Sequence, residues 1–287
     1  MLLLSSPPVN RALPEQLAEQ AEWLRQQLPQ WLMHEQQQLQ LVLLDNQPDS
    51  PYSSALQAFQ QVLRLEYPGQ IADLLLLPTD VPASVLEEAL QATPSALQGQ
   101  IRLWHGPGQW QVPQLVATPL PAPATSQPID GTVLLTGGQS ALATVVLPQL
   151  LAQGAAAVVI CSRRAEPADF AAWLSSVLPD ATQAPRVHWS CTDVCDAAAL
   201  ALCLQQIEDT LPPLQGIWHC AGQLADVSLA RMSAGQLSAV LAPKVRASLN
   251  LHQATLHLPL RQFVLFSSVA AVLGNFGQAN YALGNGF

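Results

Sequence analysis

The chain has 287 residues, of which 49% are hydrophobic and 11% charged, and its formal net charge at pH 7 is -9. This composition excludes a mainly disordered chain, because disordered segments are rich in charge and poor in apolar residues. The acidic balance offers no basic surface to phosphate backbones, so no nucleic-acid partner is expected. No apolar run approaches the roughly 20 residues of a membrane span. The five cysteines, without a CxxC pair, indicate a reduced, cytoplasmic protein.

The first 118 residues are expected to alternate helices and strands without any cluster of catalytic residue types. Apolar residues recur at nearly helical spacing over 53–66, whereas short continuous apolar runs indicate buried strands. The expected elements are a helical stretch over 13–39 interrupted by Pro29, strands over 39–44 and 71–77, helices over 53–66 and 83–92, and a hairpin of 101–104 with 109–112.

Residues 119–128 (PLPAPATSQP) contain four prolines. Such a run favours extended polyproline geometry and is typical of a linker. We therefore expect a domain over residues 1–118, a linker over 119–128, and a second domain over 129–287.

The second domain has a regular pattern. Strands are expected over 132–135, 156–161, 186–190, 216–220 and 261–267, each of the first four followed by a helical stretch, the last of which breaks near Pro243. Strands that alternate with helices of this length imply right-handed crossovers and a doubly wound parallel sheet of the Rossmann type. The predicted fold class is α/β.

A degraded glycine motif follows the first of these strands. Dinucleotide-binding turns have the pattern Gly-x-Gly-x-x-Gly, whereas here only Gly138 remains, with Ser140 and Ala143 at the later positions. Ser140 is expected to put a side chain where the backbone should approach a pyrophosphate, so a turn that binds no nucleotide stays an alternative. The candidate phosphate contacts are Gly137, Gly138, Ser140 and Leu142.

Further candidate cofactor residues follow the next three strands. Ser162 and Arg163 follow the second, where an arginine can bind the ribose 2′-phosphate and select NADPH. Asp193 and Val194 follow the third, at the adenine position, and Ala221 and Gly222 follow the fourth, where small residues leave room for the cofactor. The alternatives are a solvated surface arginine for Arg163 and a helix N-terminal acid for Asp193.

The last third of the chain carries Lys244 in "LAPKV", Ser268 in "FVLFSSVAAVLG", and Tyr281 and Asn285 in "GQANYALGN". With "HCAG" at 219–222, these stretches resemble the ketoreductase domain of modular type I polyketide synthases, a branch of the short-chain dehydrogenase/reductase superfamily. The usual superfamily pattern is Tyr-x-x-x-Lys. Asn285 at the fourth position after Tyr281, with the lysine supplied earlier by Lys244, is characteristic of the synthase-embedded branch.

The resemblance extends back to about Leu39 and implies that the first half is the family's structural subdomain, a degenerate Rossmann-like half without cofactor. It also implies two kinds of partner: an acyl carrier protein whose phosphopantetheine holds a β-ketoacyl substrate, and other synthase domains.

In the implied mechanism Tyr281 protonates the ketone oxygen as NADPH delivers hydride, and Ser268 donates a hydrogen bond to that oxygen. A phenol has a pKa near 10, which the Lys244 ammonium would lower, and Asn285 would hold the lysine or a water.

Further expectations concern the configuration of the product, the extent of the chain and metal binding. Leu224-Ala225-Asp226 fits the entrance signature of members that form the D-configured alcohol, and Leu273 replaces the tryptophan of the opposite class. Family members continue beyond Asn285 through two further strands and a lid helix, so the chain is expected to be a fragment of a synthase. The alternative to an active reductase is a non-catalytic remnant with a structural role.

An independent alcohol dehydrogenase fits badly, because Tyr-x-x-x-Lys is absent. No metal is expected, and His219 is predicted to pack or to position a loop.

Overall fold

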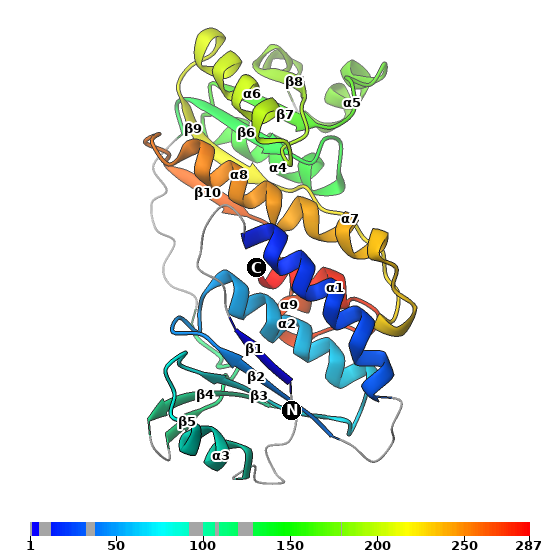
Figure 1. The fold of residues 1–287 in the computed structure, drawn as a ribbon. Helices are drawn as coiled ribbons and strands as arrows, with labels where there is room; N and C mark the ends of the chain where they lie inside the picture. Colours follow the sequence, from blue (N-terminus) through cyan, green and yellow to red (C-terminus); the bar gives the residue numbers. More distant parts are fainter. Residues whose placement is uncertain are drawn as a thin grey trace. The chain divides into compact units, whose positions relative to one another are not determined.

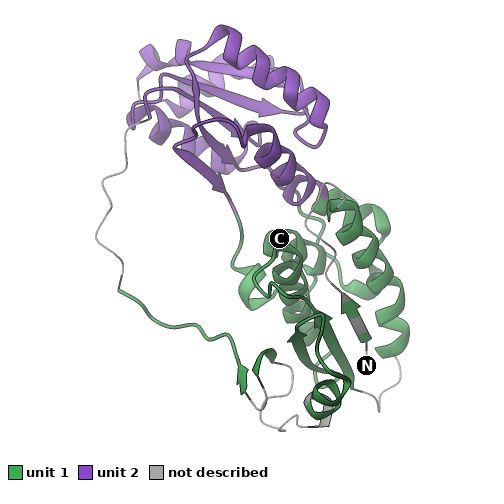
Figure 2. Cartoon of the chain, turned by 60° about the vertical axis from the view of Figure 1, so that its left-hand side comes forward, with its two compact units in different colours: residues 1–119, 224–241, 267–287 green, residues 120–223, 242–266 purple. Residues whose placement is uncertain are grey.

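The computed structural model describes residues 2–5, 13–32, 38–91, 100–106, 109–119, 129–178 and 180–287. Two compact units divide the chain (Figure 2), and each is described by itself. Unit 1 comprises Met1–Pro119, Leu224–Leu241 and Ser267–Phe287; unit 2 comprises Leu120–Gln223 and Ala242–Phe266. The predicted linker lies outside the described residues except for Pro119. Within the described ranges no helix is long and apolar enough to cross a membrane.

The units differ from the predicted domains at two segments. Residues 224–241 and 267–287, which the sequence assigns to the second domain, pack with the N-terminal residues in unit 1. The difference arises because their contacts are made with helices distant in sequence, which no local pattern reports.

Unit 2 is built on a parallel five-stranded sheet whose strand order is β10-β9-β6-β7-β8 (Figure 1). Its strands are β6 (Thr132–Thr136), β7 (Ala157–Ser162), β8 (Val187–Cys191), β9 (Leu214–His219) and β10 (Gln262–Leu265). The strand order reverses between β6 and β9, and ligands of open α/β sheets bind at such a switch point, beyond the carboxyl ends of the strands. The predicted doubly wound parallel sheet is confirmed.

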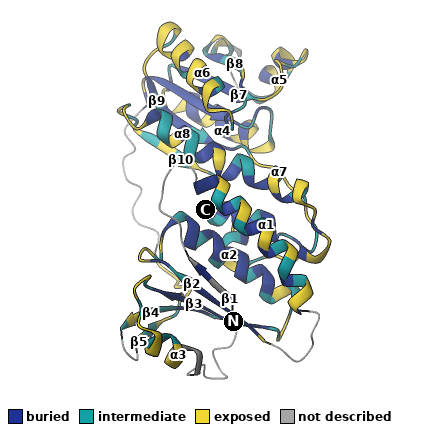
Figure 3. Ribbon diagram, viewed as in Figure 1, coloured by how far each residue is buried: buried dark blue, intermediate teal, exposed yellow. Residues whose placement is uncertain are grey.

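Helices cover both faces of this sheet. They are α4 (Ala141–Ala152), α5 (Phe170–Val177), α6 (Ala197–Thr210) and α8 (Arg246–Thr255), with a 3₁₀ turn η2 (Ala181–Arg186). The helix α7 (Ala234–Lys244) is divided between the units, and its last three residues belong to unit 2. Alternate residues of β6 enter different cores: Val133 and Leu135 pack with α4 and α5, and Leu134 packs with α6 and α8. This two-sided burial explains why the three middle residues of β6 are apolar; all five residues of the strand are buried (Figure 3).

Unit 1 contains a second five-stranded sheet, with β1 (Leu2–Ser5), β2 (Leu39–Leu44), β3 (Ile71–Leu77), β4 (Ile101–Gly106) and β5 (Gln109–Gln111) in sequential order. The first four strands pair in parallel, and β5 closes the predicted hairpin. This strand order never reverses, so the described strands of this sheet form no switch point. The sequence did not predict β1.

Helices from three parts of the chain complete unit 1. These are α1 (Leu13–Leu32), which contains Pro29, α2 (Pro51–Glu66), α3 (Ala83–Gln91), α9 (Ala270–Leu273), α10 (Ala279–Gly286) and a 3₁₀ turn η3 (Leu229–Arg231). The helices α2 and α10 approach each other closely: a Cβ built on Gly286 would lie 2.6 Å from the Ala58 Cβ. Only glycine fits there, so the two helix backbones come into direct contact.

A carboxylate occupies the amino end of α2. Asp45 follows β2, is 9% exposed, and accepts hydrogen bonds from the hydroxyls of Ser50 (2.6 Å) and Ser53 and from the Gln47 N–H (2.8 Å). Ser50 in turn caps α2 by accepting from the Ser53 N–H. In a nucleotide-binding half this helix end would receive a phosphate; here the protein's own anion lies there.

A buried ion pair joins β3 and β4. Asp73 is fully buried, Arg102 is 3% exposed, and the Arg102 Nη1 lies 3.3 Å from the Asp73 Oδ2. The other Asp73 oxygen accepts from the Gln100 N–H, and the Arg102 guanidinium stacks 4.4 Å from the Trp110 ring centroid. The guanidinium is thus held between a single carboxylate and an aromatic face.

Candidate active site

The glycine turn of unit 2 joins β6 to α4 with two residues in left-handed conformation, Gly137 at φ 108° and Gly138 at φ 58°. Their N–H groups both donate to the Cys161 carbonyl, at 3.1 and 3.3 Å. A Cβ on Gly137 would lie 3.1 Å from the carbonyl carbon of Cys220. The two glycines thus let the ends of β6, β7 and β9 converge at the switch point.

Ser140, the third candidate phosphate contact, directly precedes α4. It is the N-cap of α4, and its Oγ accepts a hydrogen bond from the Ala143 N–H at 3.2 Å. The side chain is therefore directed to its own helix. It satisfies one of the four N–H groups that the first turn of a helix leaves without a helical partner. The remaining donors of that turn still make an anion-binding end.

Gln139 provides a test of whether this turn fits a dinucleotide. Its Nε2 is buried and has no hydrogen-bond partner in the described chain. An unsatisfied donor in the glycine turn, beside the amino end of α4, is suited to an anionic group. Leu142, the fourth phosphate candidate, is 42% exposed in the first turn of α4. The residues present fit a nicotinamide dinucleotide at this edge.

The segment after β7 carries Ser162 and two exposed arginines, Arg163 and Arg164. The Ser162 Oγ accepts from the Arg164 N–H at 3.2 Å, and the Arg164 carbonyl accepts from the Trp189 indole at 3.1 Å. The backbone of the arginine pair is thereby held while Arg163 remains open to solvent. Both the solvated and the phosphate-binding interpretation of Arg163 are compatible with this exposure.

Asp193 and Val194 follow β8. The Asp193 Oδ1 accepts from the Cys195 N–H at 2.9 Å, and the N-cap of α6 is Asp196 instead, whose carboxylate accepts from Ala198 and Ala199. The predicted alternative of a helix N-terminal acid is therefore wrong for Asp193. Val194 is buried, and its carbonyl accepts from the Asn250 side chain.

Lys244 ends α7 and is 8% exposed. Its Nζ donates to the Phe266 carbonyl at 2.7 Å, and a Cβ on Gly222 would lie 3.3 Å from its Cε. Gly222, which follows β9, therefore leaves room for the lysine side chain. Burial lowers the pKa of the Lys244 ammonium from its ordinary value.

His219 links three backbone segments around Lys244. Its Nε2 lies 2.6 Å from the Pro243 carbonyl and its Nδ1 2.7 Å from the Thr136 hydroxyl. Because a carbonyl only accepts, Nε2 carries the proton, and Nδ1 accepts from Thr136. The ring is 1% exposed, and burial lowers its pKa to about 4. His219 positions the residue before Lys244, as predicted, and in the described chain no group of His, Cys, Asp and Glu could hold a metal.

Neutral His219 makes stability dependent on pH. Unfolded histidine binds a proton below about 6.5, whereas the folded ring stays neutral to about 4. The unfolded state therefore binds more protons in this window, and stability falls as pH decreases. Between pH 7 and 5 we expect His219 to account for a loss of about 2 kcal/mol. Urea unfolding of wild type and His219→Gln should show this difference in slope; equal slopes would contradict it.

The last segment of unit 1 begins with Ser267 and Ser268, shortly after β10. The Ser268 Oγ accepts from the Ala270 N–H at 3.2 Å, just before α9, and its hydroxyl proton remains available for donation. The Ser267 Oγ donates to the Asn285 carbonyl at 2.8 Å. This bond, which the sequence did not reveal, fastens the serine segment to α10.

Tyr281 and Asn285 lie one turn apart on α10. Asn285 is 9% exposed; its Nδ2 donates to the Tyr281 carbonyl at 2.9 Å, and its Oδ1 is buried without a hydrogen-bond partner among the described residues. No hydrogen bond in the described chain involves the Tyr281 hydroxyl. Fully buried Asn280, also missed by the sequence, accepts from the Tyr281 N–H and donates to the Ala225 carbonyl. Of the four predicted catalytic residues, Ser268, Tyr281 and Asn285 belong to unit 1 and Lys244 to unit 2.

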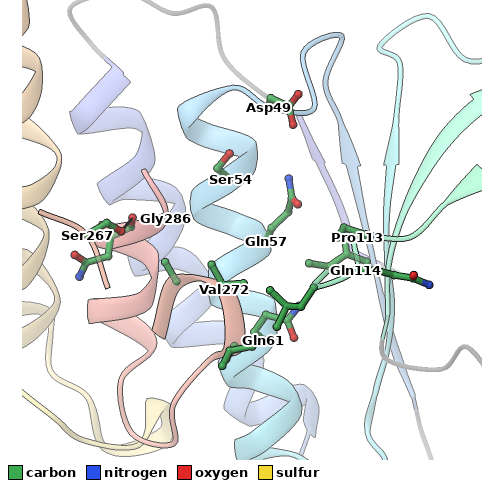
Figure 4. A pocket seen from close by; sticks show the side chains of 14 residues that line it. Asp49, Ser54, Gln57, Gln61, Pro113, Gln114, Ser267, Val272 and Gly286 are labelled. Carbon is green, nitrogen blue, oxygen red and sulfur yellow. Dashed lines mark hydrogen bonds between the residues drawn. The ribbon is translucent and has the colours of Figure 1, made fainter. Parts of the chain in front are cut away.

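A groove of about 610 Å³ also lies in unit 1 (Figure 4). It is lined by Gln57 and Gln61 of α2, by Ser267 and Val272, and by the end of α10. Asn285 lines it, but Ser268 and Tyr281 do not, and Asp49 is the one ionisable residue among the described residues of its lining. We therefore do not assign the reaction to this groove.

Comparison with known proteins identifies the family. A model of the KR domain matches residues 131–287. The chain belongs to this family. It is a ketoreductase domain of type I polyketide synthases, and such domains are oxidoreductases of the short-chain dehydrogenase/reductase superfamily that use a nicotinamide cofactor.

Two curated relatives and one solved structure illustrate the likeness. The "Putative inactive phenolphthiocerol synthesis polyketide synthase type I Pks1" of Mycobacterium tuberculosis is 38% identical over 60% of this chain and 11% of its own length. "Chalcone synthase cfoA" of Aspergillus candidus is 37% identical over 82% of this chain and 8% of its own. An A-type ketoreductase from a modular polyketide synthase matches with a TM-score of 0.74 and 26% identity, covering 99% of this KR domain and 75% of that chain.

This KR domain thus spans about a tenth of the length of the curated relatives it matches. Each of these two relatives therefore contains much sequence outside the region that this chain matches. The likeness to solved ketoreductases extends over both units, including the N-terminal sheet that the family model leaves out.

Proposed function

We propose that this KR domain reduces a β-ketoacyl thioester, held on the phosphopantetheine of an acyl carrier protein, to the β-hydroxyacyl thioester with NADPH. The principal support is that all the predicted cofactor residues belong to unit 2, whose sheet has a switch point between β6 and β9. The left-handed glycine turn and the unpaired Gln139 donor at that edge suit an anionic dinucleotide.

Bound NADPH would supply a hydride to the carbonyl carbon. In the proposed reaction the Tyr281 hydroxyl donates its proton to the carbonyl oxygen, and Ser268 donates a hydrogen bond to the same oxygen as negative charge develops there. The ammonium of Lys244 favours the phenolate that Tyr281 becomes. The unpaired Asn285 Oδ1 can accept from the ammonium or water that returns a proton to Tyr281.

Cofactor binding tests the first step. Trp189 lies between the glycine turn and the arginine segment: its indole donates to Arg164, and its ring lies 3.6 Å from a Cβ built on Gly138. We expect NADPH to quench tryptophan fluorescence saturably and to bind more tightly than NADH. Arg163→Ala should remove about tenfold or more of this preference, since a hydrogen bond between charged groups contributes about 1.5–3 kcal/mol.

Neighbouring Arg164 provides the matched control. Arg164→Ala removes the same charge from the same segment, and it should retain more of the preference than Arg163→Ala. Equal binding of NADPH and NADH to the wild-type chain would contradict the assigned cofactor. A folded chain that binds neither nucleotide would contradict the proposed reduction.

The second candidate function is that of a non-catalytic, structural remnant. It is favoured by Ser140, whose hydroxyl already occupies one donor at the amino end of α4, and by the name of the mycobacterial relative, which calls that protein inactive. One assay distinguishes the two candidate functions, in which NADPH consumption is measured with the N-acetylcysteamine thioester of a β-ketoacid. A reductase consumes NADPH in this assay, whereas a structural remnant does not. Chiral analysis of any product tests the expected D configuration.

A further inference from the structure

Glu66, the last residue of α2, bonds to two segments of unit 1 that lie far from it in sequence. Its Oε2 accepts from the Leu229 N–H at 2.7 Å, and its Oε1 accepts from the Gly277 N–H at 3.1 Å. Each carboxylate oxygen thus receives one backbone donor. A residue of the N-terminal half, which carries none of the predicted reacting groups, bridges two segments near the end of the chain.

One of these segments directly follows the predicted substrate entrance, and the other directly precedes Tyr281. Leu229 follows the Leu224–Asp226 signature, and Gly277 lies four residues before Tyr281. The segments also bond directly to each other: the Val227 N–H donates to the Gly277 carbonyl at 2.7 Å, and the Gln278 side chain donates to the Asp226 carboxylate at 2.9 Å. Glu66 therefore lies at a three-way junction with both segments.

The charge of Glu66 suits this arrangement. A carboxylate has an acceptor on both oxygens, whereas a carboxamide has an acceptor on one and donors on its nitrogen. Hydrogen bonds to a charged acceptor contribute about 1.5–3 kcal/mol, more than neutral ones. Glu66 is half-buried, and burial raises the pKa of its carboxyl while the two backbone donors oppose that shift.

We propose that Glu66 is a positioning residue of the reductase, which fixes the entrance segment 224–229 against the turn before Tyr281 and thereby sets how the acyl substrate approaches. This inference rests on the proposed function. It assigns a specificity role to a residue outside the predicted cofactor and catalytic sets, through its two backbone hydrogen bonds.

Amide hydrogen exchange tests the junction without requiring activity. In the full chain carrying Glu66→Gln, the backbone amide of either Leu229 or Gly277 should exchange about tenfold or more faster than in wild type. A tenfold change corresponds to a loss of about 1.4 kcal/mol of local stability. Glu66→Ala should accelerate both. The control is Glu88→Gln, the same chemical change on the exposed face of α3, which should alter neither. Unchanged exchange of both amides in a folded Glu66→Ala chain would overturn the inference.

Kinetics with the N-acetylcysteamine thioester test the consequence for substrate. Glu66→Gln should raise KM about tenfold, change kcat much less, and shift the ratio of product enantiomers, because segment placement changes and the reacting groups do not. NADPH affinity should stay as in wild type. Faster exchange with unchanged KM and enantiomer ratio would overturn the positioning role. A wild-type chain that fails to reduce the thioester would overturn the proposed function, and the exchange result would still decide the junction.

Discussion

Replacing Tyr281 with phenylalanine is expected to lower kcat about 10²- to 10⁴-fold, the usual contribution of a positioned proton donor. Stability should change little, because no hydrogen bond in the described chain involves the Tyr281 hydroxyl, and the phenyl ring keeps its place on α10. NADPH affinity should also persist, since the candidate cofactor residues belong to unit 2. The measurements are steady-state reduction of the thioester and fluorescence titration of NADPH.

Tyr67 supplies the matched control for this experiment. The chain has only three tyrosines, and the Tyr67 hydroxyl is buried without a hydrogen-bond partner in unit 1. Tyr67→Phe removes the same oxygen and should leave kcat unchanged. Equal losses in the two variants would indicate that the Tyr281 effect is structural, and an active Tyr281→Phe chain would remove Tyr281 from the proposed reaction.

Replacing Asp73 with alanine is expected to reduce the free energy of unfolding by about 3–5 kcal/mol, because breaking a buried pair leaves an uncompensated charge. Arg102 is 3% exposed, its Nε already has no hydrogen-bond partner in the described residues, and Asp73 is the carboxylate that it contacts. Urea unfolding followed by circular dichroism measures the loss.

A double variant separates charge burial from loss of packing. In Asp73→Ala combined with Arg102→Met, the unpaired guanidinium is removed and an apolar chain remains against Trp110. Replacing both partners of a buried pair by apolar groups is often close to neutral, so the double variant should regain most of the stability. A double variant as unstable as Asp73→Ala would show that the space left by the carboxylate, and not the charge, causes the loss.

The sequence predicted the strands and helices that are determined by the pattern of apolar residues within their own segment. The strand β6 has an apolar centre and is buried on both faces. The segments that follow β6, β7, β8 and β9 lie at the carboxyl edge, because these strands are parallel. Family spacing supplied Lys244, Ser268, Tyr281 and Asn285, which remain predictions. Glycine content alone could not show that the Ser140 hydroxyl caps α4.

What the sequence missed depends on distant partners. The strand β1 has only four residues and exists because β2 pairs with it. Glu66 is one of several polar residues at a helix end, and nothing near it in the chain marks Leu229 or Gly277 as its donors. The same holds for His219, whose positioning role was predicted in outline. Its hydrogen-bond partners, Thr136 and Pro243, are distant from it in the chain, and only the fold places them beside its ring.

The direct backbone contact of α2 with α10 at Gly286 has a consequence for the exchange of ketoreductases between synthases. The helix that carries Tyr281 and Asn285 matches a surface made by residues near position 58, more than 200 residues earlier in the chain. A recombination point anywhere between them combines a helix from one parent with a surface from another. Chimeras should therefore inherit α2 and α10 from the same parent, so that the crossovers fall before Pro51 and beyond Gly286.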